Sequence, residues 1–192
     1  MKDHFFSAES QTFESKDFSK KSFDSQDFVD CCFFSCNFTE TFLRKSKFTS
    51  CTFKNCNFSL VKLDGCSLQD VQFIDCKIVG AEFFKCNKTF FSTNFQNCLL
   101  HYCNFSDLNM KNTSFLKNKI KENHFINTLL NGSCFKDVDL FGTIFHNCDL
   151  SKADFSKAFN YNIDPTTNNI KKAKFSLPEA VGLLRGFDIT LV

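Results

Sequence analysis

The stretch CTFKNCNFSL at residues 51–60 contains the pattern that decides the fold. It holds two copies of a five-residue unit, in which a small residue, Cys51 or Cys56, precedes a phenylalanine, Phe53 or Phe58, by two positions. The remaining positions of each unit are mostly polar. Self-similarity at a fixed short period is the sequence signature of a repeat architecture, so this stretch predicts a solenoid.

The large apolar residue at the centre of the unit recurs every five residues along most of the chain. One series contains Phe13, Phe18, Phe23, Phe28, Phe33, Phe38, Leu43, Phe48, Phe53, Phe58, Leu63, Leu68, Phe73, Ile78 and Phe83. A second, shifted by two residues, contains Phe90, Phe95, Leu100, Phe105, Met110, Phe115, Ile120, Phe125, Leu130, Phe135, Leu140, Phe145, Leu150 and Phe155. Since hydrophobic residues make up only 43% of the chain, this regularity does not follow from composition.

A period of five fits neither an α-helix nor a β-strand, whose side chains repeat every 3.6 and 2 residues. A chain that turns a corner every five residues can bury both the centre and the small residue two before it. Four such sides close a coil of twenty residues, and twenty-nine repeats then give about seven coils, a rod on the order of 35 Å long. Adjacent coils would bury a continuous core between them.

The repeats of residues 11–160 resemble the pentapeptide-repeat family. That resemblance implies an all-β fold, a right-handed quadrilateral parallel β-helix. We expect an N-terminal cap or frayed segment at residues 1–12, a solenoid at 13–175, and a C-terminal helix and tail at 176–192. The spacing from Phe83 to Phe90 is seven, which places a two-residue insertion near 84–89. It is either a partner-binding loop or a tolerated insertion.

Within the solenoid, the alternation of aromatic and aliphatic centres after Phe95 predicts two phenylalanine columns that face each other across the core. One column contains Phe95, Phe115 and Phe135, and the other contains Phe105, Phe125 and Phe145. Asn118 and Asn123 interrupt the series of small inward residues, and we expect their amides to bond backbone groups, because an unpartnered buried amide costs about 1–3 kcal/mol.

The C-terminal sequence predicts a cap for the open end of the coil. Ser176-Leu177-Pro178-Glu179 reads as a capping box, so a short capping α-helix is expected to run to about Arg185 and stop at Gly186. In an α-helix, Leu177, Val181 and Leu184 share a face and would plug the coil. Five residues then need other cover, namely Leu183, Phe187, Ile189, Leu191 and Val192.

A second copy of the chain would supply that cover, through a homodimer at the C-terminal end. Residues 163–180 are similar to the C-terminal region of bacterial quinolone-resistance pentapeptide-repeat proteins, in which a comparable tail dimerises. The alternative is a tail that only caps a monomer.

Ten of the twelve cysteines occupy the small inward position, and the exceptions are Cys32 and Cys134. A twenty-residue coil stacks them in columns: Cys36, Cys56, Cys76 and Cys98; Cys66 and Cys86; Cys31 and Cys51. Stacked side chains lie about 4.8 Å apart, wider than the Cβ separation of about 3.8 Å that a disulfide needs. We expect buried, reduced thiols with a packing role, and no metal, because a linear ladder does not offer tetrahedral ligands. A thiol-redox role is the alternative.

The sequence contains no recognisable catalytic constellation or cofactor motif, so we expect neither enzymatic activity nor a cofactor. His101, His124 and His146 are assigned to outward positions on different sides. The net charge of +2 with interspersed signs does not favour direct nucleic-acid binding. No stretch has the length of a signal peptide or membrane span, so we expect a cytoplasmic protein without membrane contact.

These observations favour a non-enzymatic scaffold that binds another protein. The candidate partner surface is the outward cluster Leu60, Val79, Leu99 and Tyr102. The family resemblance implies an alternative, since quinolone-resistance members mimic duplex DNA and bind DNA gyrase or topoisomerase, giving fluoroquinolone protection. DNA mimicry needs a strongly acidic surface, which a nearly neutral chain does not provide.

Overall fold

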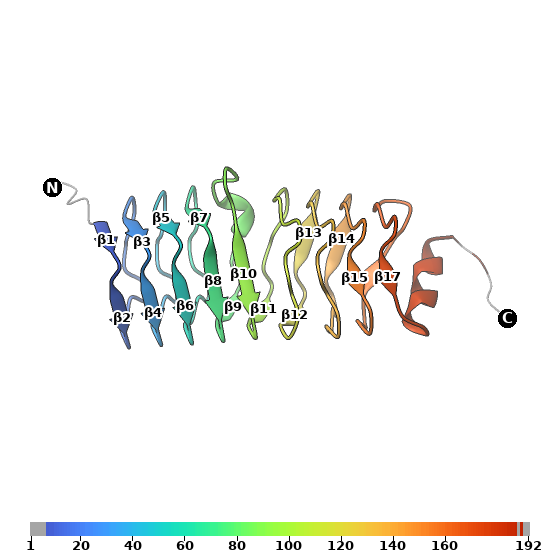
Figure 1. The fold of residues 1–192 in the computed structure, drawn as a ribbon, viewed down its shortest axis with the longest axis horizontal. Coiled ribbons are helices and arrows are strands. Elements are labelled where there is room, and N and C mark those ends of the chain that lie inside the picture. The colour runs from blue at the N-terminus through green and yellow to red at the C-terminus, as the bar shows by residue number, and fades with distance from the viewer. Residues whose placement is uncertain (1–6, 188, 190–192) are drawn as a thin grey trace.

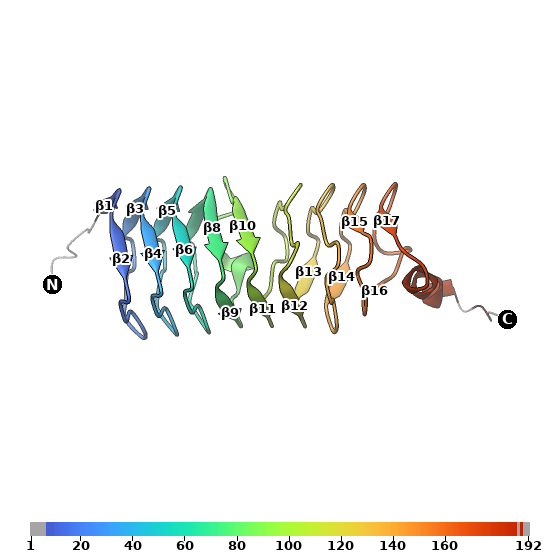
Figure 2. The ribbon, with the colours of Figure 1, turned by 60° about the horizontal axis from the view of Figure 1, so that its bottom comes forward.

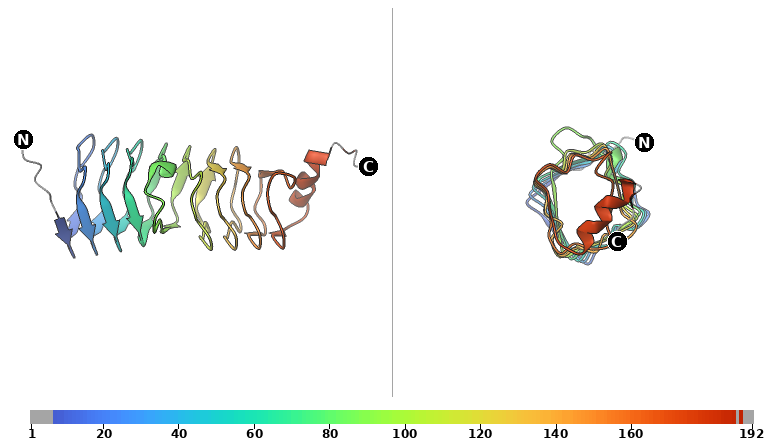
Figure 3. Two further views of the ribbon diagram at one scale, coloured as in Figure 1. Left: turned by 90° about the horizontal axis from the view of Figure 1, so that it is seen from above. Right: turned by 90° about the vertical axis from the view of Figure 1, so that its right-hand side faces the viewer.

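The computed structural model describes residues 7–187 and residue 189. The chain winds into a rod of about eight turns, in which all strand pairs are parallel and each coil stacks on the next (Figure 1). Seen along the rod, the coils superpose as a four-sided outline (Figure 3). The expected β-solenoid of the pentapeptide-repeat type is therefore confirmed, with about eight turns where the sequence predicted seven.

Short strands form the sides of the coil, and strands on the same side pair from one coil to the next (Figure 2). The first sheet contains β1 (Ser7–Glu9), β3 (Asp27–Val29), β5 (Lys47–Thr49) and β7 (Ser67–Gln69). The second contains β2 (Thr12–Glu14), β4 (Cys32–Phe34), β6 (Thr52–Lys54), β8 (Val71–Ile74) and β10 (Thr93–Gln96). The others contain β9 (Lys77–Val79), β11 (Leu99–His101) and β12 (Lys119–Lys121); β13 (His124–Ile126), β14 (Ile144–His146) and β16 (Asn162–Ile163); and β15 (Asp154–Phe155) and β17 (Lys174–Phe175).

The corners of the coil come from residues in the left-handed region of backbone conformation. Ser50, Asn55, Leu60 and Gly65 have φ of 52°, 55°, 57° and 68°, and such residues recur every five positions over most of the rod. Serine, asparagine and aspartate occur often at these corners, as expected of short polar side chains that bond locally. This repeated turn is what converts a period of five into a four-sided coil.

Phenylalanine rings stack in columns along the core. Phe115 stacks on Phe135 with centroids 4.6 Å apart, and Phe105 stacks on Phe125 at 5.1 Å. The two columns meet edge to face, with Phe115 and Phe125 at 5.7 Å and an interplanar angle of 82°. Both arrangements are favourable aromatic geometries. The predicted pair of facing phenylalanine columns is confirmed.

The small inward residues tie neighbouring coils together by hydrogen bonds. The Cys56 thiol donates to the Phe33 carbonyl oxygen at 3.4 Å, and the Thr128 hydroxyl donates to that of Phe105 at 3.1 Å. Asn118 makes the same bond to Phe95 at 2.8 Å, and its Oδ1 also accepts the N–H of Cys98 at 2.7 Å. The expected backbone bonding of the inward asparagines is thus present, and these positions select a small donor as well as a small volume.

The solenoid begins earlier in the chain than the expected boundary at residue 13. Strand β1 pairs with β3 in register, with Ala8 opposite Phe28, and Ala8 is buried. Ala8 occupies the central position of its repeat, and a search for large apolar residues does not detect a repeat with alanine there. The coil that holds Ala8 accounts for part of the additional turn.

The coil departs from twenty residues at two places, the insertion and a step of eighteen between β14 and β16, where Phe145 pairs with Ile163. Strand register advances by twenty residues per turn up to β8, whereas Phe95 pairs with Phe73, a step of twenty-two. A 3-10 turn, η1 (Phe83–Lys85), precedes a loop that projects beyond the outline of the coils (Figure 3, right). Phe90, predicted as a core centre, is 75% exposed, and Phe91 is buried instead.

A helix lies across the C-terminal end of the rod (Figure 3, right). It is η2 (Glu179–Phe187), a 3-10 helix and not the expected α-helix. The predicted plug residues do not cover the core, because Leu177, Val181 and Leu184 are exposed. Leu183 packs against the core in their place. The Ser176 hydroxyl accepts the N–H of Lys157, a contact between coils.

Candidate interaction surfaces

An apolar surface covers the C-terminal end of the rod. Exposed large side chains from the last coils and from η2 gather there, and we call them the C-terminal surface: Phe141, Phe159, Leu177, Val181, Leu184, Phe187 and Ile189. Six of the seven line a groove of about 940 Å³, and Phe187 is the exception. Soluble monomers rarely expose large contiguous apolar patches, which often mark interaction sites.

The groove also contains an unsatisfied polar atom. Tyr161 lines the groove and is buried, and its hydroxyl has no hydrogen-bond partner among the described residues. Burial raises the pKa of this hydroxyl, which keeps it protonated and able to donate. A buried donor without a partner is unfavourable, so this hydroxyl destabilises the fold locally at the end of the rod.

The candidate dimer residues fall into three groups. Phe187 and Ile189 are about half exposed at the C-terminal surface, Leu183 packs against the core, and Leu191 and Val192 lie outside the described residues. The sequence analysis did not identify Phe141 and Phe159. The signal available was a phenylalanine at an outward position of the repeat, in two successive coils.

The candidate partner patch lies on one side of the rod. Strand β11 pairs with β9, so that His101 lies opposite Val79 and Leu99 opposite Lys77. Leu60 and Tyr102 are exposed at corners, and Val79 and Leu99 are partly buried. The four residues come together as the sequence predicted, but lysine and histidine side chains interrupt them, so the apolar area is small.

Tyr102 belongs to a small polar cluster beside this patch. Its ring stacks on His101 with centroids 4.1 Å apart, and His101 Nε2 lies 2.8 Å from Glu122 Oε2. A hydrogen bond with Tyr102, followed by one with His101, holds the pKa of the Glu122 carboxyl below its usual value. Glu122 therefore stays ionised and fixes both rings.

All twelve cysteines are free thiols. The predicted columns are buried, namely Cys36, Cys56, Cys76 and Cys98; Cys66 and Cys86; Cys31 and Cys51. Burial raises the pKa of Cys51 to about 12, and the thiols of Cys56 and Cys98, together with burial, raise that of Cys76. A high pKa keeps the sulfurs of Cys51 and Cys76 as thiols, the unreactive form.

Several surface charges are paired across coils. Arg44 pairs with Asp24, Lys47 with Asp27, Lys85 with Asp64 and Glu82, Lys88 with Asp107, Lys121 with Asp139, and Lys174 with Asp154. The partners come mainly from successive coils, so positive and negative side chains alternate along the rod. This arrangement does not form a continuous acidic surface.

Catalytic and metal-binding clusters are not apparent in the part of the chain that the structure describes. No group of three or more histidine, cysteine, aspartate or glutamate side chains there could hold a metal ion. His124 and His146 occur on the paired strands β13 and β14, which corrects their assignment to different sides. Within the same residues, no helix has the length and apolar character needed to cross a membrane.

Comparisons with known proteins agree with this architecture. A family model described as a pentapeptide repeat region matches residues 46–125, and one for pentapeptide repeats in eight copies matches residues 124–158. No curated protein matches the chain in sequence.

Two solved structures of QnrB1, a plasmid-mediated fluoroquinolone resistance protein, are similar over nearly the whole chain. The full-length form has a TM-score of 0.52 and 18% identity, covering 97% of this chain and 99% of that one. A trypsin-treated variant has a TM-score of 0.51 and 18% identity, covering 97% and 100%. HetL of the cyanobacterium Nostoc, involved in heterocyst differentiation regulation, has a TM-score of 0.40 and 13% identity over 88% and 84%. The repeat, the four-sided coil and the two family models together identify this chain as a member of the pentapeptide-repeat family.

Proposed function

We propose that this protein is a non-enzymatic scaffold that pairs with a second copy through its C-terminal surface and binds a partner protein along its sides. The observation that carries the proposal is the exposed groove of about 940 Å³ at the end of the rod, where six apolar side chains of the C-terminal surface lie among polar ones such as Glu179 and Arg185. Half-exposed Phe187 and Ile189, with Leu184 beside them, give the surface the aromatic and aliphatic character that is typical of an interface core.

A second copy is a suitable occupant because the surface lies at one end of the rod. A two-fold axis there would place the same apolar residues on both sides of the contact, as isologous interfaces require. The sides of both rods would remain accessible.

The partner would bind along the sides. The loop at residues 86–91 is the most prominent projection, and Phe90 at its corner is 75% exposed with φ of 60°. The patch of Leu60, Val79, Leu99 and Tyr102 is the second candidate surface. The twelve reduced thiols support a cytoplasmic location.

The self-association is tested with the double variant Leu184→Glu/Phe187→Glu. We expect the wild type to sediment as a dimer and the variant as a monomer, because each change places charge in the apolar contact. Leu116→Glu is the matched control, since Leu116 is similarly exposed but lies on a side of the rod. A monomeric wild type across the micromolar range would contradict the proposal.

A second candidate function is binding of DNA gyrase with protection from fluoroquinolones, for which the full-length structural similarity to QnrB1 is the supporting observation. The net charge of +2 weighs against it, since a DNA mimic presents a strongly acidic surface. The test is gyrase supercoiling with and without a fluoroquinolone. Inhibition of supercoiling, or rescue from the drug, would favour this function, and no effect at high protein concentration would reject it for the enzyme tested.

A further inference from the structure

The N-terminal end of the rod is a second apolar opening, which we call the N-terminal mouth and define by Phe13, Phe18 and Phe23. These rings are half-buried, whereas Phe33 and Phe38, one coil further in, are buried. The mouth contains a cavity of about 350 Å³. Strand β2 is the terminal strand of its sheet, so its outer edge has no paired strand in the described structure. Unpaired edges and apolar openings both favour association.

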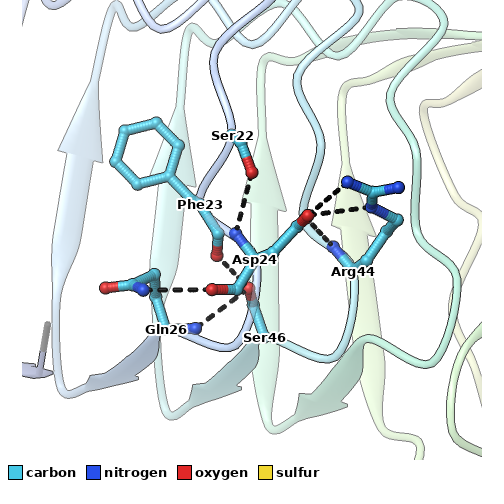
Figure 4. Close-up of polar contacts among 6 residues, drawn as sticks. All are labelled: Ser22, Phe23, Asp24, Gln26, Arg44 and Ser46. Atoms are coloured by element: carbon cyan, nitrogen blue, oxygen red, sulfur yellow. Dashed lines mark hydrogen bonds and ion pairs between the residues drawn. The ribbon is translucent and has the colours of Figure 1, made fainter. Parts of the chain in front are cut away.

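Part of the rim of the mouth is already fixed by contacts within the chain. Asp24 accepts hydrogen bonds from the backbone and the guanidinium of Arg44, in the next coil (Figure 4). Although burial acts to raise it, these bonds hold the pKa of the Asp24 carboxyl below its usual value. Asp17 accepts bonds from Ser19 and Asn37. Both carboxylates are therefore engaged within the chain, although Asp17 is exposed and keeps a negative charge between Lys16 and Lys21.

The remaining rim charges are separated by sign. Glu9 and Glu14 precede the corner residue Ser15, whereas Lys16 and Lys21 follow it, and all four are exposed. None of the four forms an ion pair with another described residue. Lys21 donates to the backbone carbonyl oxygen of Asp17 at 2.8 Å, which holds its ammonium group at the rim. Acidic and basic halves of one surface are the pattern that a self-complementary contact requires.

A two-fold axis through Ser15, perpendicular to the rod, makes the two halves complementary. The rotation pairs residues of the two copies that lie equally far from Ser15 in the sequence. A residue that precedes Ser15 in one copy lies opposite one that follows Ser15 in the other. Glu14 then lies opposite Lys16 of the second copy, and Glu9 lies opposite its Lys21. The same operation sets Phe13 opposite the segment that contains Phe18, so that half-exposed rings cover one another.

We propose that two copies of this protein associate mouth to mouth about this axis, held by the rings of the mouth and by the four ion pairs that the symmetry generates. The contact is limited to the cross-section of the rod, below the standard size of about 800 Å² per partner. We therefore expect weak, salt-sensitive association. It is distinct from the contact at the C-terminal surface, and the two together would join rods end to end.

Charge exchange tests the contact in the Leu184→Glu/Phe187→Glu background, so that the C-terminal surface does not contribute. Glu9→Lys/Glu14→Lys and Lys16→Glu/Lys21→Glu are each expected to weaken self-association by roughly tenfold or more, measured by sedimentation at high micromolar concentration. An equimolar mixture of the two should associate again, because opposite charges then meet. The control Lys117→Glu/Lys119→Glu changes the net charge by the same amount as Lys16→Glu/Lys21→Glu. It should self-associate as strongly as the Leu184→Glu/Phe187→Glu protein.

A cysteine placed on the axis gives a second test. Ser15→Cys should form an intermolecular disulfide under mild oxidation, whereas Ser35→Cys, at the same corner one coil further in, should not exceed the background. Both serines are exposed, with φ of 52° and 51°, so the replacements are matched. The proposal is overturned if the background is monomeric at every concentration, or if neither charge reversal weakens association. Those results would assign cover of the mouth to residues 1–6 or to a different protein.

Discussion

Asn123 donates a hydrogen bond from its side-chain amide to the carbonyl oxygen of Leu100, in the neighbouring coil, at 2.9 Å. Its Oδ1 accepts the N–H of Cys103 at 2.6 Å, so one buried side chain satisfies a donor and an acceptor of the adjacent coil. We expect Asn123→Ala to lower the free energy of unfolding by about 1–3 kcal/mol, since both backbone groups lose their partner. Asn123→Thr should cost less, because Thr128 makes the equivalent donor bond. Urea denaturation measures both, and a loss equal to that of exposed Asn94→Ala would contradict the interpretation.

Alkylation of the native protein should distinguish two classes of cysteine. Cys32 and Cys134 are partly exposed, whereas Cys51, Cys66 and Cys76 are buried. We expect iodoacetamide to modify Cys32 and Cys134 first, and the other ten only as coils open. Mass spectrometry at successive times measures the number of alkylated cysteines, with urea-unfolded protein as the control for full modification. Rapid labelling of Cys76 would argue against the buried column.

Alkaline pH should destabilise the fold through the inward thiols. Burial raises the pKa of Cys51 and Cys103 to about 12, from a reference of 9.0. An unfolded chain loses these protons at lower pH than the folded one, so stability is complete below about pH 9 and falls as pH rises toward 12. The denaturation midpoint, followed from pH 8 to pH 11, measures the effect. Cys51→Ala/Cys103→Ala should have a shallower pH dependence, and an unchanged slope would exclude these thiols as its source.

Core phenylalanines should differ in importance along the rod. Phe125 is fully buried and contacts Phe105, Phe115, Phe135 and Phe145. Phe125→Ala should cost about 3–5 kcal/mol, because its cavity is enclosed on all sides. Phe13→Ala, at the half-open mouth, should cost clearly less. Calorimetry of both variants is the measurement, and equal losses would show that the terminal coil is as well packed as the interior.

The sequence predicted the solenoid because the period is expressed in side-chain size, the quantity that a packed core selects. The prediction failed where size gave no signal. Ala8 is a central residue without bulk. Phe90 and Phe91 are adjacent candidates for one core position. Counting five residues back from Phe95 selected Phe90, but Phe90 occupies the loop corner and Phe91 is buried. Periodicity does not determine which residues of an insertion leave the coil.

The C-terminal helix illustrates a second limit. The capping pattern predicted a helix near residue 179, and η2 begins there. A 3-10 helix has three residues per turn and not 3.6, so Ala180 and Leu183 share the half-buried face, whereas Val181, Leu184 and Phe187 share an exposed one. The face in contact with the core therefore changed, and the predicted plug residues became part of the C-terminal surface. The type of helix depends on tertiary contacts that are not contained in the capping motif.

Most coils of the rod contain twenty residues, so the number of coils sets the length of the rod. Each block of twenty residues advances the rod by one strand spacing, about 4.8 Å, and returns the chain to the same corner. Gain or loss of such a block would move the two ends apart or together in fixed increments, without changing the shape or the orientation of either end. The distance between the two proposed contact surfaces could therefore be adjusted by duplication alone, while both surfaces keep their sequence.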